Sequence, residues 1–290
     1  MDCLSPVNGT MIDQSIAWSH RAILLHSYHM RNGTPELSSF KRALALLDLV
    51  LDDAGQSNVS VIAGKAAIPV STAHRQIASL VSIGYLTPLG EGHHAAGPRL
   101  RRLAQSLDEK QIVAQLAEAP LRRMASWAGG VCQFGTLEND MVTYRIKTGP
   151  RADALFTRTG MQLEAYCSGI GKVLLAFLPD PLRDAYLTNG PFIALTERTI
   201  TDPAQLRAAL VAVQLQGYAI DDREVAPDLR CIAVPIRWPG GAVGAAISVS
   251  CSTLAVPRRK DEDVTDRMIA AAAEIERAAF PSSNPTSQHR

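Results

Sequence analysis

The sequence predicts an α+β protein in which an N-terminal winged helix-turn-helix is joined by a linker helix to a mixed α+β sheet domain. Three observations predict it: two short helices within residues 59–86, a strand pair directly after them, and strands mixed with helices after residue 128. The chain has 290 residues, enough for two domains with separate cores, and 47% of them are hydrophobic, as in folded globular proteins.

The stretch VSVIAGKAAIPVSTAHRQIASLVSIGYL, residues 59–86, contains a short helix, a tight connection at 67–69 and a second helix that ends near Gly84. One face of the second helix is apolar, through Ala73, Ile77, Leu80 and Val81. The opposite face is polar and carries no acid: Ser71, Arg75, Ser79 and Ser82, flanked by Thr72, His74 and Gln76. This pattern indicates a helix-turn-helix, although an ordinary helical hairpin with a solvated face has the same pattern.

A predicted hairpin follows the second helix. Residues 85–89 have strand character, residues 90–92 form a turn, and residues 93–96 can return as a second strand, which makes the hairpin a wing. Residues 38–103 also hold seven Lys and Arg against four acids, whereas the whole chain has a net charge of only +1. A modestly basic module suits a partner that carries phosphates.

Three stretches of this module, SSFKRALALLDLVL, AAIPVSTAHRQIASLVSIGYL and GPRL, resemble the DNA-binding domain of IclR-type bacterial transcriptional regulators. The chain departs from that family at Ala67, where glycine is usual, and at residues 93–96, where a basic or aromatic wing is usual. The resemblance implies binding to a double-stranded DNA operator. We expect the DNA contacts at Lys65, Ser71, Thr72, His74, Arg75, Ser79 and Arg99.

Two features of the second domain suit a small ligand. The segment CSGIGK, residues 167–172, leads from a strand into a helix, where free N–H groups and the helix dipole favour a small anion such as a carboxylate. Its spacing is not that of a P-loop, and glycines chosen only for close packing give the same pattern. Ser248 and Ser250 share one face of a strand by period two, so they either satisfy each other or line a pocket.

Both features match the effector-binding domain of the IclR family: YCSGIGKVLLAFL resembles its helix start, and REVAPDLRCIAVPI with GAAISVS resembles its closing strands. The resemblance spans nearly everything from residue 38 to residue 280 and implies a GAF-like α+β sheet domain with a ligand pocket. It would place nine residues around the effector: Leu155, Leu163, Gly169, Ile170, Asp221, Leu229, Cys231, Ser248 and Ser250. Structural roles are the alternative, since Cys231 can be a small buried hydrophobe and Asp221 can end a strand.

The chemistry of that pocket indicates its ligand. Amide donors and hydroxyls at one end, with leucines at the other, describe a monocarboxylate with an apolar or aromatic body. Asp221 would repel a second carboxylate but could accept a hydrogen bond from a ligand hydroxyl. We therefore expect a monocarboxylate effector, with or without a hydroxyl group.

Several function classes are excluded or disfavoured by composition. All seven histidines lie outside residues 104–280, so the sheet domain holds no Cys–His or Ser–His pair and no imidazole ligand for a metal. The five cysteines are scattered without CxxC spacing, which suits a reducing cytoplasm. No apolar run reaches the roughly 18–20 residues that cross a bilayer, and the N-terminus lacks a signal-peptide pattern. We expect a cytoplasmic protein that is not an enzyme, with no membrane partner, no metal and no cofactor.

The expected segments are an N-terminal extension (1–37), the winged helix-turn-helix (38–103), a linker helix interrupted at Pro120 (104–128), the effector-binding domain (129–280) and a disordered tail (281–290). Within the fourth segment we expect a strand near 154–157 and a helix from Ile170 that Pro179 and Pro181 close. A helix over residues 40–51 has a broader apolar face than one small domain needs, which makes it the candidate contact to a second copy.

The expected function is a DNA-binding transcriptional regulator, a repressor or an activator, that binds a near-palindromic operator as a homodimer and responds to the effector. The resemblance further implies a dimer of dimers as an assembly. The alternative is a metabolite-binding or catalytic domain whose N-terminal module only contacts other proteins. Operator binding distinguishes the two.

Overall fold

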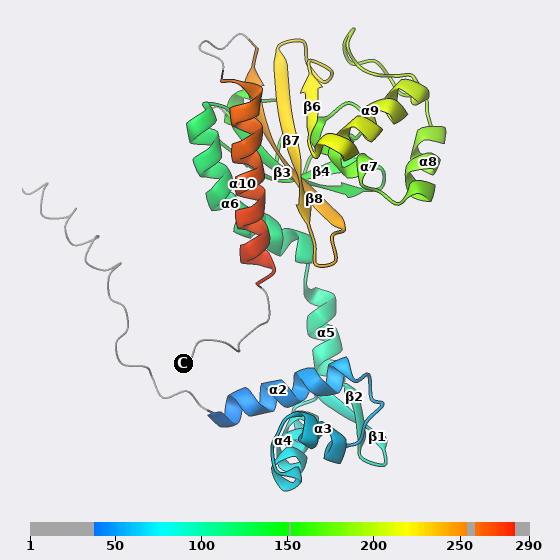
Figure 1. The fold of residues 1–290 in the computed structure, drawn as a ribbon, viewed down its shortest axis with the longest axis vertical. Coiled ribbons are helices and arrows are strands. Elements are labelled where there is room, and N and C mark those ends of the chain that lie inside the picture. Colours follow the sequence, from blue (N-terminus) through cyan, green and yellow to red (C-terminus); the bar gives the residue numbers. More distant parts are fainter. Residues whose placement is uncertain (1–37, 151, 254–258, 282–290) are drawn as a thin grey trace, which may run out of the picture. The chain divides into compact units, whose positions relative to one another are not determined.

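The computed structural model describes residues 38–150, 152–253 and 259–281, so the expected N-terminal extension and almost all of the expected tail lie outside the described residues. The chain divides into two compact units between Leu107 and Asp108. The first is a helical unit with a small hairpin and the second contains a six-stranded sheet covered by helices, which confirms the predicted α+β class (Figure 1).

The first unit is a three-helix core with a wing. Its elements are α2 (Ser38–Asp52), α3 (Val59–Lys65), α4 (Val70–Ser82), β1 (Leu86–Gly90), β2 (His93–Ala96) and α5 (Pro98–Ser106). Leu46 of α2, Ile62 of α3, Ile77 of α4 and Leu86 of β1 are at most 2% exposed and form the centre of its core. The apolar face predicted for the second helix is therefore the face that holds α4 in place.

The connection between α3 and α4 turns at Ala67, whose φ of 53° lies in the left-handed region. The backbone amide of Ala67 donates to the carbonyl of Gly64, and that of Ile68 donates to the carbonyl of Ala63, both at 3.1 Å. A residue with a Cβ atom costs roughly 1–2 kcal/mol in this region, which explains why glycine is favoured in such a turn. The chain makes the tight turn nonetheless, with alanine.

The second unit is built on an antiparallel sheet of strand order β5-β4-β3-β8-β7-β6. The strands are β3 (Val131–Glu138), β4 (Met141–Thr148), β5 (Gln162–Glu164), β6 (Ala219–Asp222), β7 (Leu229–Arg237) and β8 (Val243–Ser252). The register places Gln133 of β3, Ser248 of β8 and Ala233 of β7 in one row across the sheet, and Asp221, Cys231 and Ser250 in a neighbouring row. Residues that pair directly share a face, so these polar side chains gather on one side.

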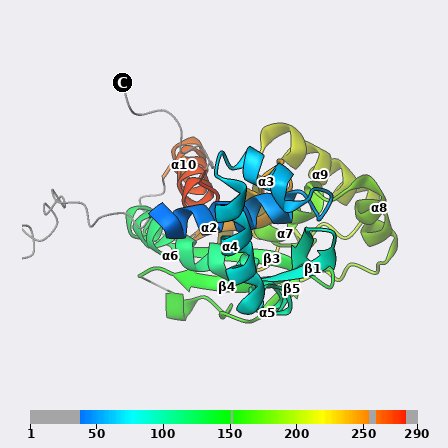
Figure 2. The ribbon, with the colours of Figure 1, turned by 90° about the horizontal axis from the view of Figure 1, so that it is seen from below.

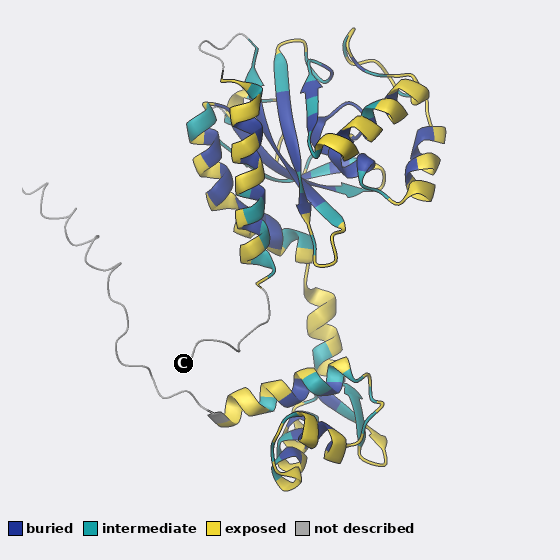
Figure 3. Cartoon of the chain, viewed as in Figure 1, coloured by how far each residue is buried: buried dark blue, intermediate teal, exposed yellow. Residues whose placement is uncertain are grey.

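Helices cover both faces of this sheet. On one face α6 (Glu109–Ala128) and α10 (Asp261–Ala279) lie side by side, and on the other lie α7 (Gly169–Ala176), α8 (Asp180–Thr188) and α9 (Pro203–Gln216) (Figures 1 and 2). Each layer has its own apolar core, with Phe134 and Ile247 on the first side and Ile170 and Leu206 on the second. Figure 3 shows the central strands as the most deeply buried part of the unit.

Two predictions about the helices before residue 129 were wrong. Residues 104–128 do not form a single linker helix; the chain forms α5 and then α6. Pro98 starts α5, and the Asp108 carboxylate caps α6 by accepting from the amide of Gln111 at 3.0 Å. The helix is not interrupted at Pro120, which lies buried inside α6. The packing of neighbouring buried residues such as Ala117 and Leu121 outweighs the lost N–H group. As a result α6 contributes to the core of the sheet unit.

Two further predictions differ from the structure. The segment 154–157 is not a strand, and a short 3₁₀ turn (Ala152–Ala154) stands at its start. The carbonyls of Leu155 and Thr157 accept from the ammonium group of Lys147, so they are not available to a neighbouring strand. Pro179 and Pro181 were predicted only to close the helix that became α7, but Pro181 lies in the first turn of a further helix, α8.

Candidate functional site

The polar face of α4 is exposed. Ser71, His74, Arg75 and Ser79 are exposed and Thr72 is half-buried, on the side of the helix opposite Ala73 and Ile77. The hydroxyl of Ser79 donates to the carbonyl of Arg75 at 3.0 Å, one turn back in the same helix. The Arg75 side chain is thus free of the core and lies on a face with no acid, which suits a base edge or a phosphate.

Lys65 and Arg99, the two expected contacts outside α4, have partners in their own domain. The Nζ atom of Lys65 lies 2.7 Å from Oδ1 of Asp53, and this hydrogen bond, with those from Ser57, lowers the pKa of Asp53 to about 2. The Arg99 guanidinium lies 5.4 Å from the centre of the Tyr85 ring. Both cations are exposed, so each could contact DNA only while sharing its charge with that partner.

The wing is a β1–β2 hairpin with paired ends at Leu86 and Ala96. Nδ1 of His93 lies 3.0 Å from the carbonyl of Gly55 between α2 and α3, whereas Nδ1 of His94 lies 3.2 Å from the carbonyl of Gly92 in the wing's own turn. Both residues are half-buried. In this chain the wing strand 93–96 is therefore tied to its own domain.

The second candidate site is a small cavity between the start of α7 and strands β6, β7 and β8. All nine residues expected around an effector line it: Leu155, Leu163, Gly169, Ile170, Asp221, Leu229, Cys231, Ser248 and Ser250. Its volume is about 20 Å³. The structure thus brings together residues that are up to 95 positions apart, from Leu155 to Ser250.

One wall of the cavity is the N-terminus of α7. The hydroxyl of Ser168 caps the helix and accepts from the amide of Gly171 at 3.0 Å. The amides of Gly169 and Ile170 belong to the first turn, where N–H groups have no partner within the helix. A Cβ atom at Gly171 would lie 2.0 Å from the carbonyl oxygen of Ala165, so close packing does require that glycine. Close packing therefore accounts for Gly171, and the anion-site interpretation of the first-turn amides stays a prediction.

The acidic residue of the cavity is Asp221, only 1% exposed. Burial raises the pKa of its carboxyl group from 3.8 to about 6, although a hydrogen bond from the amide of Glu224 opposes the rise. Its neighbour on β7, Cys231, has an Sγ atom 3.1 Å from Oγ of Ser250. Burial and the nearby Asp221 raise the pKa of Cys231 well above its usual value, so this thiol is a neutral hydrogen-bonding group.

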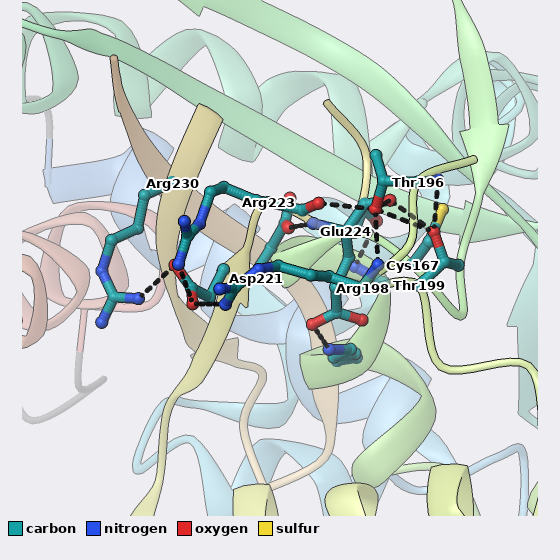
Figure 4. Close-up of polar contacts among 12 residues, drawn as sticks. Cys167, Thr196, Arg198, Thr199, Asp221, Arg223, Glu224 and Arg230 are labelled. Atoms are coloured by element: carbon teal, nitrogen blue, oxygen red, sulfur yellow. Dashed lines mark hydrogen bonds and ion pairs between the residues drawn. The ribbon is translucent and has the colours of Figure 1, made fainter. Parts of the chain in front are cut away.

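A buried ion pair supports the loop beside Asp221. Lys172 of α7 pairs with Glu224, and both side chains are less than 10% exposed (Figure 4). The hydroxyl of Thr199 donates to the carbonyl of Glu224 at 2.7 Å, and the hydroxyl of Thr196 donates to that of Arg223, also at 2.7 Å. Arg223 has a left-handed φ of 68°. The backbone of residues 221–224 is thus held in one conformation from several sides.

Within the described ranges, no group of three or more His, Cys, Asp or Glu residues is placed to hold a metal ion. Among the same residues, no helix is both long and apolar enough to cross a membrane.

Two family models match the chain. The model described as bacterial transcriptional regulator IclR C-terminal matches residues 104–277, and the IclR helix-turn-helix domain matches residues 39–90. The chain belongs to the IclR family. It is a transcriptional regulator with a helix-turn-helix and an effector-binding domain, which confirms the family expected from the motifs.

Several relatives cover most of this IclR-family chain. The Pca regulon regulatory protein of Pseudomonas putida is 30% identical over 79% of this chain and 80% of its own length. The HTH-type transcriptional regulator BhcR of Paracoccus denitrificans is 31% identical over 82% of this chain and 86% of its own. The solved structure of an IclR homolog from Microbacterium hydrocarbonoxydans, complexed with 4-hydroxybenzoate, is 27% identical, with a TM-score of 0.56 and coverage of 85% of this chain and 100% of that one.

Sequence reasoning missed six residues that line the cavity of this IclR-family chain: Gln133, Tyr144, Phe156, Thr157, Ser168 and Val225. One of them had a signal, since Ser168 is a typical helix cap before GIG. Phe156 and Thr157 had none, because their segment was predicted as a strand. Burial raises the pKa of the Tyr144 phenol, so its hydroxyl stays protonated in the cavity wall.

Proposed function

We propose that this regulator binds a palindromic operator as a homodimer and that a monocarboxylate in the small cavity of the sheet domain controls that binding. The convergence of the nine expected residues on one cavity carries the proposal. Two amides at a helix start and two serine hydroxyls supply four donors for one anionic group, and three leucines supply an apolar wall. The relative complexed with 4-hydroxybenzoate, a hydroxylated monocarboxylate, supports the ligand class.

The proposed DNA contacts are the exposed residues of α4, with Lys65 and Arg99 at the sides. The wing is proposed to contribute little, because it presents no basic or aromatic side chain over residues 93–96 other than two histidines, of which His93 contacts the carbonyl of Gly55. The proposed dimer contact is the exposed apolar part of α2, where Phe40 is 62% and Leu44 is 42% exposed while Leu46 and Val50 fill the core. A two-fold dimer would place two recognition helices about one DNA turn, or a multiple of it, apart.

The test is selection of DNA from a random pool by the full-length protein, followed by release with 4-hydroxybenzoate. We expect two inverted half-sites whose centres are about 10 base pairs, or a multiple, apart. The acid should change the affinity for the selected site, whereas 4-hydroxybenzamide, which lacks the charge, should not. Enrichment of a single unrepeated half-site would contradict the dimer, and equal effects of acid and amide would contradict the carboxylate.

A further inference from the structure

A larger cavity adjoins the small one in the sheet unit. Its volume is about 410 Å³, and it opens at the end of the sheet where β3 and β7 begin and β8 ends. The two cavities share four lining residues, Leu155, Phe156, Leu229 and Ser250. The two cavities are therefore adjacent, and these four residues form the boundary between them.

The larger cavity has an apolar floor. Val131, Ile232, Val249 and Val264 line it, and all four side chains are at most 7% exposed. These residues come from three strands and from α10. Ile232, Val249 and Val264 belong to the core on the α6–α10 side of the sheet, so an effector body that reaches them from the small cavity passes around the end of the sheet. Such a floor favours hydrocarbon over a sugar or a nucleotide.

Two arginines at the rim of the larger cavity are already paired. Arg230 lies 3.0 Å from Oδ1 of Asp222 and also pairs with Asp261. The Arg259 guanidinium lies 4.0 Å from the centre of the Trp127 ring and donates to the Trp127 carbonyl at 2.9 Å. A second carboxylate on a ligand would have to compete with these partners. The larger cavity is therefore suited to an uncharged body.

The small cavity cannot hold a whole effector. Its 20 Å³ is close to the ~10–15 Å³ that a single water molecule needs on this measure, which is room for a head group and little else. The four residues whose amides and hydroxyls are the proposed donors for a carboxylate, Gly169, Ile170, Ser248 and Ser250, all line this small space. The rest of any effector bound there must go elsewhere, and the larger cavity is the adjoining space.

We propose that the larger cavity is the binding site for the body of the effector, and that the effector is an elongated amphipathic monocarboxylate. Its carboxylate occupies the small cavity and its hydrocarbon part passes Leu155 and Phe156 into the larger one. This proposal rests on the proposed function, since it assumes that the small cavity binds the carboxylate. Phe156 is 47% exposed, so its ring can turn aside while Lys147 holds the backbone of Leu155 through its carbonyl at 2.7 Å.

The experiment measures the dissociation constants of straight-chain monocarboxylates, from acetate to decanoate, for the full-length protein by calorimetry. Each methylene group buried in an apolar cavity strengthens binding about fourfold. We expect that increase to begin once the chain passes the head-group site and to stop when the larger cavity is full. The corresponding straight-chain amides serve as controls for the head group.

Two variants test the location. Ala128 and Ala226 line the larger cavity and not the small one, so A128F and A226F should each flatten the length dependence and leave the affinity for the shortest acids unchanged. Ala119 lies on the exposed side of the same helix as Ala128, so A119F should behave as wild type. The use of two independent cavity variants covers the case in which one fails to fold.

The outcomes separate this inference from the proposed function. Short acids that bind as tightly as long ones would overturn the body site but leave the carboxylate site standing. A length dependence that persists in both A128F and A226F would place the body elsewhere and overturn the inference as well. If no straight-chain acid of any length binds, this inference fails; the proposed function fails as well only if 4-hydroxybenzoate does not bind either.

Discussion

The Oδ1 atom of Asp221 accepts a hydrogen bond of 2.7 Å from the backbone amide of Glu224. The Glu224 side chain in turn pairs with Lys172 at the start of α7, the helix whose first amides line the same cavity as Asp221. Glu224 therefore connects Asp221, the acidic residue of the cavity, to α7, the helix that supplies the proposed amide donors. A ligand that moves either of them must strain the other.

The stability of the sheet domain should depend on Asp221 in acid. The pKa of Asp221 is raised from 3.8 to about 6, so between about pH 4 and pH 6 the native state keeps a proton that the unfolded state has lost. The free energy of unfolding should therefore fall as the pH rises through this window, by at most about 3 kcal/mol from this group. Asp221→Asn keeps an acceptor for the Glu224 amide and does not titrate, so it should remove that fall.

Denaturant unfolding at pH 4, 5, 6 and 7 checks this for the wild type and the variant. Asp228→Asn, on an exposed residue, is the matched control and should keep the wild-type profile. Identical pH profiles for wild type and Asp221→Asn would show that burial does not perturb this carboxyl group.

The buried pair of Lys172 and Glu224 should be costly to break from one side. Glu224→Gln leaves a buried ammonium group without a counter-charge, which typically costs about 3–5 kcal/mol. The double variant Lys172→Met/Glu224→Met removes both charges and should recover most of that loss. Chemical denaturation of the wild type and the two variants measures the free energy of unfolding. A double variant as unstable as Glu224→Gln would mean that the ion pair itself stabilises the fold and that the unpaired charge is not the cause of the loss.

The left-handed turn between α3 and α4 should be stabilised by glycine. Ala67 has a φ of 53°, so Ala67→Gly removes a strain of about 1–2 kcal/mol at a smaller entropic cost, for a net gain of about 0.5–1 kcal/mol. The neighbouring Ala66 has a φ of −81°, so Ala66→Gly should instead destabilise. Melting of the helical unit within the full-length protein compares the two, and equal signs for both would refute the argument from strain.

Arg75 should contribute to sequence recognition. Its side chain lies on the exposed face of α4, so Arg75→Ala should leave the fold intact. The loss should be about 1–3 kcal/mol on the selected operator if Arg75 contacts a base. If Arg75 contacts a phosphate, Arg75→Ala would instead weaken binding to all DNA sequences alike, and the slope of log affinity against log salt concentration would become shallower by about one unit. Arg122→Ala, on an exposed arginine of α6, is the control; unchanged affinity in Arg75→Ala would remove this residue from the interface.

The sequence predicted most of the elements because their signals are local. The apolar face of α4 and the strand pair that follows this helix are readable from a few neighbouring residues. The errors occurred where distant residues decide. The carbonyls of residues 155 and 157 bond to Lys147, and Pro120 is tolerated in α6 because the core around it is well packed.

The cavity illustrates the same division. The strand period predicts that Ser248 and Ser250 share a face, and the predicted helix start identifies Gly169. That these residues lie beside Asp221 depends on the order of strands in the sheet. The family resemblance supplied that order. Gln133 and Tyr144 were missed because their strands carry no local mark of a pocket, and the larger cavity was not foreseen because its lining comes from strand ends and helix ends.

The most direct test of the carboxylate site compares 4-hydroxybenzoate with 4-hydroxybenzamide in a thermal-shift measurement on the full-length protein, alongside other aromatic, keto and hydroxy acids with their amides. An acid at ~100 times its dissociation constant stabilises the folded protein by about 2.7 kcal/mol, a readily visible shift. We predict that acids raise the melting temperature and amides do not, and that Ser248→Ala/Ser250→Ala loses the response while its own melting temperature stays near wild type. Amides that act as well as acids, or a double variant that still responds, would contradict a carboxylate site in this cavity.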